Sequence, residues 1–184
     1  MDISGVLSLK DFIAELAITI STGGNLVMNF PPDKNGRVLP IFEERLRDIG
    51  KFIGAHEEAI YTTKPWIFQN DTDSTIWYTS RLRNASGFDP YRYYNPQQEN
   101  NTIIYAFVLE WPIDNIVSMP LIIPTRKTTI TLLGTNISLP VVLDFDGGME
   151  TSIAGISAPL FPSLDVFVLK IEYAADQNVN PLED

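Results

Sequence analysis

Hydrophobic positions near the start of the chain recur with the period of an α-helix. Over residues 9–20 they stand three or four residues apart and form one stripe: Leu9, Phe12, Ile13, Leu16, Ala17 and Ile20. The same spacing returns over residues 40–53, where Pro40 suits the first helical turn and Gly54 suits a terminator. The pattern therefore predicts two amphipathic helices, each with one apolar face to bury.

A short apolar run at residues 25–30 lies between these two helices. Gly23-Gly24 precedes the run and Pro31-Pro32 follows it, so it predicts a buried strand bounded by turns. Helix, strand, loop, helix is the order of an α/β layer. One or two such units cannot close a sheet alone, so we expect a remnant of a larger α/β fold.

After about residue 65 the pattern changes to short β-rich runs separated by Pro, Gly, Asn and Asp. No helical stripe intervenes, so the runs predict an antiparallel β-sandwich. Residues 84–101, rich in Asn, Gln, Tyr and Pro, predict a long loop. The expected strands are 75–80, 102–111, 119–123, 128–133, 137–143, 149–153 and 164–173.

These patterns divide the chain into three parts. We expect an incomplete α/β unit at 1–68, an all-β antiparallel sandwich at 69–176 and a disordered polar tail at 177–184. The β part has roughly the 100 residues that a sandwich needs.

Charge and composition exclude several classes of function. The net charge of −10 argues against nucleic acid and anionic membrane surfaces as partners. No apolar stretch is long enough for a membrane span. The chain has no cysteine and one histidine, His56, so thiol chemistry, a multi-histidine metal site and a Ser-His-Asp triad are not expected. We expect no metal and no cofactor.

Four N-glycosylation sequons point to the secretory pathway. They begin at Asn70, Asn84, Asn100 and Asn136. The start of the chain has no basic segment typical of a signal peptide, so we expect the N-terminal part of the protein to be missing from this sequence.

A series of motifs stands in order along the chain, at residues 23–29, 32–36, 41–46, 49–52, 58–66, 76–79, 105–112 and 130–134. Together these motifs resemble the α-L-fucosidases, glycoside hydrolase family 29. The first motifs match the end of that family's catalytic barrel, and later ones match the first strands of its C-terminal sandwich. Two positions depart from the family: Pro31-Pro32 replaces Gly-Pro, and His56-Glu57 replaces Asn-Gly.

The resemblance implies the last unit of a (β/α)₈ barrel followed by the sandwich. It also implies a retaining glycosidase with an Asp nucleophile and a Glu acid/base, both upstream of this chain, so no residue here inherits either role. The whole enzyme would release terminal α-L-fucose from fucosylated glycans or glycolipids, in lysosomes or secreted fluids. Homo-oligomerisation is compatible with this reading.

Among the residues present, Asn29 is the candidate for substrate binding, because it would lie near the carboxyl end of the last barrel strand. We expect the Asn25 side chain to form a hydrogen bond with the backbone of the turn that it follows. Glu57 and Glu58 could be considered as a catalytic pair, because retaining glycosidases need two carboxyl groups about 5 Å apart. Adjacent side chains point in different directions, however, so we expect these two glutamates to be solvated charges at a helix end. His56 is expected on the surface.

Other candidates have simpler structural explanations. Asp144 to Gly148 resembles a calcium loop but lacks its spaced ligands, so a hairpin turn is expected. The three tryptophans, Trp66, Trp77 and Trp111, are expected in the core, and the best candidates for an exposed sugar-stacking surface are Tyr91, Tyr93 and Tyr94.

Two other hypotheses remain beside the family reading. One is a non-catalytic carbohydrate-binding or interaction module. The other is an incomplete product without a function of its own.

Overall fold

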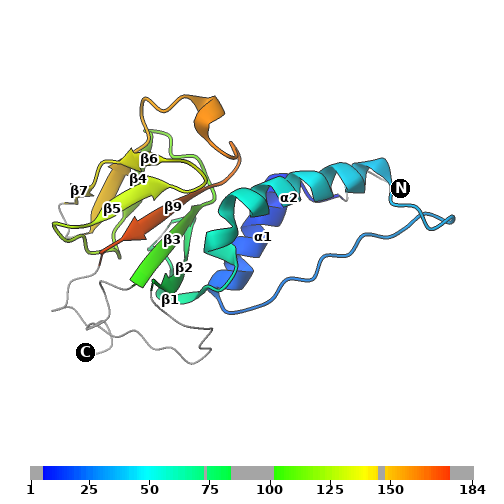
Figure 1. Cartoon of the computed structure of the whole chain (residues 1–184), viewed down its shortest axis with the longest axis horizontal. Helices are drawn as coiled ribbons and strands as arrows, with labels where there is room; N and C mark the ends of the chain where they lie inside the picture. Colours follow the sequence, from blue (N-terminus) through cyan, green and yellow to red (C-terminus); the bar gives the residue numbers. More distant parts are fainter. Residues whose placement is uncertain (1–5, 73, 84–101, 145–147, 175–184) are drawn as a thin grey trace.

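The computed structural model describes residues 6–72, 74–83, 102–144 and 148–174. These residues form two α-helices followed by two antiparallel β-sheets (Figure 1). The helices are α1 (Leu9–Ser21) and α2 (Pro40–Ile60). The strands are β1 (Lys64–Asn70), β2 (Ile76–Leu82), β3 (Thr102–Val108), β4 (Ile116–Met119), β5 (Thr129–Leu132), β6 (Ile137–Leu139), β7 (Val142–Leu143), β8 (Met149–Ser152) and β9 (Phe167–Glu172), with a 3₁₀ turn, η3 (Ala158–Leu160), before β9.

The larger sheet has the strand order β1-β2-β3-β9-β5-β6, and the smaller has the order β4-β8-β7. Every strand pair is antiparallel, and β2 and β3 pair without a break from Ile76–Val108 to Leu82–Thr102. One hydrophobic core contains side chains from both sheets, including Ile104, Leu169 and Met149. This arrangement fits the predicted antiparallel sandwich.

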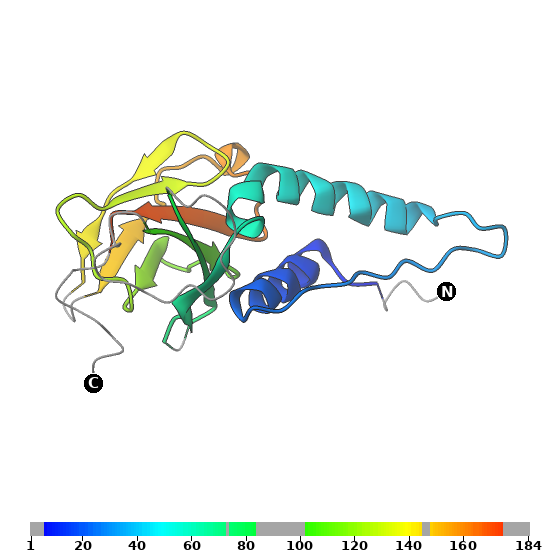
Figure 2. The ribbon, with the colours of Figure 1, turned by 60° about the horizontal axis from the view of Figure 1, so that its bottom comes forward.

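The larger sheet is covered on both faces, which explains the sequence of β3. Ile104, Ala106 and Val108 face the smaller sheet, whereas Tyr105 and Phe107 face the helices. All seven residues of β3 are therefore buried, and apolar side chains stand on both faces of the strand instead of on one. The molecule is thus built in three layers, with the helices on one side of the larger sheet (Figure 2).

Helix α1 forms where the sequence predicts it. The Ser8 hydroxyl accepts a hydrogen bond from the Asp11 amide at 3.1 Å and caps the first turn. Phe12, Ile13 and Ala17 are buried against the sheet. The amphipathic stripe therefore explains both the helix and the face it buries.

Helix α2 is longer than predicted, because Gly54 does not end it. The helix continues to Ile60, with a local departure from helical geometry at His56 (φ −123°, ψ 19°). Its last turn is held by the sheet: Ala59 is buried, and its carbonyl accepts a hydrogen bond from the Thr79 hydroxyl at 2.9 Å. These contacts outweigh the roughly 1 kcal/mol that a glycine costs inside a helix.

The strand predicted at residues 25–30 is wrong for this structure. Residues 24–33 are irregular, and the Val27 side chain is 86% exposed. Leu26 and Met28 are partly buried against the helix-side core, and Phe30 contacts Phe42 of α2 edge to face. Among the described residues the segment has no strand to pair with, and an apolar run without a paired neighbour does not form a strand. The remnant of a barrel therefore stays a proposal.

Several strand predictions in the sandwich need correction. The run at 137–143 forms two short strands in different sheets, β6 and β7, because Pro140 between them cannot donate to a ladder. The strand predicted at 119–123 lies earlier, at Ile116–Met119. Strand β1 was missed; it runs across residue 68, where the sequence predicts a domain boundary.

Candidate functional site

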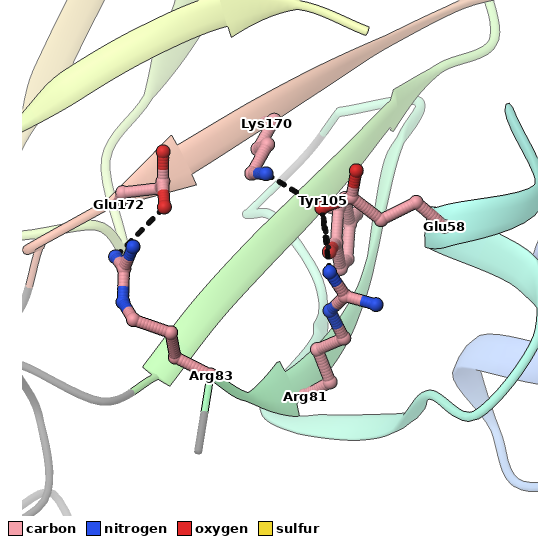
Figure 3. A network of polar contacts seen from close by, with 6 residues as sticks. All are labelled: Glu58, Arg81, Arg83, Tyr105, Lys170 and Glu172. Atoms are coloured by element: carbon pink, nitrogen blue, oxygen red, sulfur yellow. Dashed lines mark hydrogen bonds and ion pairs between the residues drawn. The ribbon is translucent and has the colours of Figure 1, made fainter. Parts of the chain in front are cut away.

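The end of α2 carries a carboxylate that three strands of the larger sheet contact. Glu58 lies in the last turn of the helix and points at the sheet (Figure 3). Arg81 comes from the end of β2, Tyr105 from β3 and Lys170 from β9, where Lys170 is the cross-strand partner of Tyr105. We call these four residues the Glu58 cluster.

All three neighbours donate to the same oxygen of Glu58. The distances to Oε1 are 2.6 Å from Lys170 Nζ, 2.7 Å from Tyr105 Oη and 2.9 Å from Arg81 Nη2. The Arg81 guanidinium also lies 5.9 Å from the centre of the Tyr105 ring. Two cations and a hydroxyl on one carboxylate oxygen make a charge-assisted clamp between helix and sheet.

The surroundings of Glu58 decide its protonation. Burial raises the pKa of Glu58, but hydrogen bonds from Lys170 and Tyr105 and the charges of Lys170 and Arg81 outweigh burial and lower the pKa overall. Burial, followed by the hydrogen bond to Glu58, raises the pKa of Tyr105. Glu58 is therefore ionised and occupied, so it is neither a proton donor near neutral pH nor a free nucleophile.

Glu57, the residue before Glu58, is not held by the sheet. Its side chain is exposed, and it lines two open hollows beside the end of α2. One hollow, of about 350 Å³, is lined by Glu57, Glu58, Tyr61, Thr62 and Arg81. The solvated helix end expected from the sequence describes Glu57; for Glu58 that expectation is wrong, because the sheet holds its carboxylate.

A second ion pair lies along the same side of the sheet. Arg83 Nη2 is 2.7 Å from Glu172 Oε1 (Figure 3), and the Arg83 guanidinium lies 4.5 Å from the centre of the Tyr173 ring. Arg83 therefore neutralises Glu172, the second acidic side chain near Lys170.

His56 was expected on the surface, and this expectation is wrong. The side chain is fully buried, its Nδ1 lies 2.8 Å from the Phe52 carbonyl oxygen, and its ring centre is 4.2 Å from that of Phe52. The error follows from ending the helix at Gly54, which placed His56 outside it. Burial lowers the pKa of His56, against a smaller opposing effect of the bond to Phe52.

We expect this buried histidine to make folding sensitive to pH. The folded-state pKa lies below 6.5, so the unfolded chain binds more protons and the free energy of unfolding falls as pH drops from 6.5 toward the folded pKa. His56→Phe keeps an aromatic ring on Phe52 and removes the titration. When the free energy of unfolding is measured in urea at pH 7.5 and at pH values below 6.5, it should fall less with pH in the variant than in the wild type. Equal losses in both proteins would contradict the prediction.

A buried carboxylate inside the sandwich was not predicted. Asp71 is 1% exposed and accepts a hydrogen bond from the Tyr78 hydroxyl. Burial raises the pKa of Asp71, and burial followed by the negative charge of Asp71 raises that of Tyr78. The pair is shut off from solvent in the core, so it cannot meet a substrate.

The weak candidate Asn29 lies in the irregular segment before α2, and both Asn29 and Asn25 are exposed. The structure does not bring Asn29 next to the Glu58 cluster, so a role in substrate binding stays a prediction. Asn70 and Asn136 are described in the structure, whereas Asn84 and Asn100 lie outside the described residues, as do Tyr91, Tyr93 and Tyr94.

The three tryptophans differ in burial. Trp66 is in the sandwich core and Trp77 is half-buried on the helix side. Trp111 is 38% exposed; its ring packs on Phe161 and Phe167, and its indole nitrogen donates to Asn115 Oδ1 at 3.3 Å. The expected core position is confirmed for Trp66 and holds only in part for Trp111.

Two further features bear on ligands and membranes. The Asp144 amide donates to the Gly148 carbonyl at 2.8 Å; residues 145–147 between them lie outside the described residues, so the expected hairpin turn stays a prediction. Within residues 6–72, 74–83, 102–144 and 148–174, no group of three acidic or histidine side chains is placed to hold a metal ion. In the same ranges, neither helix combines the length and apolar character of a membrane span.

Two family models match consecutive parts of the chain. The model described as alpha-L-fucosidase matches residues 1–58, and the model described as alpha-L-fucosidase C-terminal domain matches residues 69–172. The second match covers more than half of the 184 residues and includes each strand from β2 to β9.

Curated relatives match nearly the whole chain. The putative alpha-L-fucosidase of Caenorhabditis elegans is 39% identical over 99% of this chain, which spans 38% of that protein. The tissue alpha-L-fucosidase of Homo sapiens is 32% identical over 93% of this chain and 33% of its own length. The chain thus spans about a third of the length of these relatives.

Solved structures share the fold. An alpha-L-fucosidase matches with a TM-score of 0.69 at 19% identity, over 94% of this chain and 34% of that one. The GH29 alpha-L-fucosidase from Bacteroides thetaiotaomicron matches with a TM-score of 0.66 at 18% identity, over 95% of this chain and 34% of its own. At this identity the likeness concerns the fold alone.

Proposed function

Because the chain belongs to the α-L-fucosidase family, we propose that it is the C-terminal part of a retaining glycosidase that hydrolyses terminal α-L-fucose from glycoconjugates. The observation that carries the proposal is the order and extent of the family matches, residues 1–58 and then 69–172. We propose that these residues shape the scaffold of the enzyme, and that the Asp nucleophile and the Glu acid/base lie outside this chain.

The geometry at the end of α2 supports a scaffold role. A retaining glycosidase needs one ionised and one protonated carboxyl group about 5 Å apart and open to the sugar. Glu58 is ionised, and its Oε1 accepts from three donors, while Asp71 is buried in the sandwich. Glu58 joins α2 to the larger sheet, and Asp71 joins the end of β1 to Tyr78 of β2. Both carboxylates therefore have a structural role.

The names of the relatives also bear on the location of the protein. Their names include tissue and plasma alpha-L-fucosidases. We therefore propose a lysosomal or secreted protein, with fucosylated glycans or glycolipids as substrates of the whole enzyme.

We expect residues 1–184 alone to release no nitrophenol from 4-nitrophenyl α-L-fucoside, because this substrate needs both catalytic carboxyl groups. The human tissue enzyme, assayed in parallel, is the positive control. Turnover by residues 1–184 above the buffer rate would contradict the proposed location of the catalytic residues.

A chimera tests the scaffold role directly. Replacing the matching region of the Caenorhabditis elegans relative with this chain should give a folded protein that hydrolyses the fucoside. A folded but inactive chimera would count against the role. Glycan-array binding by residues 1–184 together with such inactivity would favour a carbohydrate-binding module instead.

A further inference from the structure

Two of the sequons lie in the described residues. The asparagine of the first is held by hydrogen bonds, whereas that of the second is exposed. The first, Asn70 to Thr72, begins at the end of β1. The Asn70 Nδ2 atom donates to the carbonyl oxygens of Ser74 and Ile76, each at 3.1 Å. Both amide hydrogens of this side chain are therefore in use.

The middle residue of the same sequon is also fixed. Asp71 is buried, bonded to Tyr78, and its backbone amide donates to the Ile76 carbonyl at 3.0 Å. An N-linked glycan is attached through the Asn side-chain nitrogen, so attachment at Asn70 replaces one of its two hydrogens. Attachment there breaks at least one hydrogen bond that closes the β1–β2 connection.

The second sequon, Asn136 to Ser138, lies at the edge of the larger sheet. Asn136 is exposed in the turn that joins β5 to the edge strand β6, and Ser138 is exposed as well. The turn is held by Thr135, whose hydroxyl donates to the Leu132 carbonyl at 2.7 Å and accepts from the Ile137 amide at 3.0 Å. Within the part of the chain that the structure describes, the Asn136 side chain makes no hydrogen bond, so the turn is held without it.

Space beside Asn136 is also available. The second open hollow at the end of α2, of about 360 Å³, is lined by Asn136 and Thr135 from the turn and by Gly54, Ala55, Glu57 and Glu58 from the helix. A sugar on Asn136 would lie beside this hollow, next to the Glu58 cluster.

We propose that Asn136 is a modification site that carries an N-linked oligosaccharide, and that Asn70 stays unmodified in the folded protein. In the transfer, a bond forms between Asn136 Nδ2 and C1 of the sugar. The bond from C1 to the diphosphate of a lipid-linked oligosaccharide donor breaks, and one amide proton leaves. In the native protein the modification rests on the proposed secretory or lysosomal location.

The test uses residues 1–184 secreted from insect cells behind an added signal peptide. Soluble protein is treated with peptide N-glycosidase F in ¹⁸O-water, which converts each glycosylated Asn to labelled Asp, and peptides are mapped by mass spectrometry. We expect label at Asn136 and none at Asn70. Label at Asn70, or none at Asn136, overturns the proposal, and neither result depends on fucosidase activity.

Two matched variants remove each sequon without touching its asparagine. Ser138→Ala should remove one glycan and increase gel mobility by one step. Thr72→Ala should leave the mobility unchanged, because Thr72 is exposed and the Asn70 hydrogen bonds remain. A mobility step in Thr72→Ala, or none in Ser138→Ala, would contradict the assignment.

Discussion

Glu58→Ala is expected to lower the free energy of unfolding by about 3 kcal/mol, because it leaves two cations and a hydroxyl without their shared acceptor. Partly buried groups lose more than exposed ion pairs when a partner is removed, and the side chains of Glu58 and Lys170 are 28% and 21% exposed. Urea unfolding near pH 7 measures the loss. The control is the adjacent Glu57→Ala, which changes an exposed side chain and should stay within about 0.5 kcal/mol.

The pH dependence of this difference gives a second check. The folded-state pKa of Glu58 lies below 4.5, so its contribution is present above pH 4.5 and is lost as pH falls through the folded pKa. The gap between wild type and Glu58→Ala should therefore narrow only below pH 4.5. A loss equal to that of Glu57→Ala at pH 7 would show that the clamp does not stabilise the fold.

Phe107→Ala is expected to cost about 4 kcal/mol, the typical loss when a large buried aromatic is truncated. Phe107 is fully buried on the helix side of β3, beside Val168 of β9. The control is Val27→Ala in the irregular segment before α2, where the side chain is 86% exposed and the change should stay within about 0.5 kcal/mol. A large loss in Val27→Ala would instead indicate the buried strand that the sequence predicts.

Local patterns account for the parts of the fold that the sequence predicts well. Helix α1 has its cap, its stripe and its terminating turn within fifteen residues, so neighbouring residues specify it. Strand β3 is apolar at almost every position, which indicates a strand even though it hides the alternation of faces.

The errors arise where distant contacts decide the structure. Gly54 favours a helix end, but Ala59 is held by Thr79 of β2, and the helix continues. The apolar run at 25–30 has the composition of a strand, yet a strand needs a neighbour to accept its hydrogen bonds. Composition alone cannot supply that neighbour.

The Glu58 cluster could not be found from the sequence for the same reason. Arg81 and Tyr105 lie 23 and 47 residues from Glu58 along the chain. No spacing rule joins such residues, because only the pairing of β2, β3 and β9 sets them side by side. The matching segment 58–66 begins at Glu58, but the match does not indicate what that side chain contacts.

The double coverage of β3 has a consequence for how this part of the family is inherited. The first family match ends at residue 58 and the second begins at residue 69. The helices and the sandwich nevertheless pack on the same strand, β3, whose alternate side chains belong to two different hydrophobic cores. A chain cut at that point would expose the face of Tyr105 and Phe107 to water, an apolar surface prone to aggregation. We therefore expect recombination at this junction to be selected against, so that the two segments are inherited together.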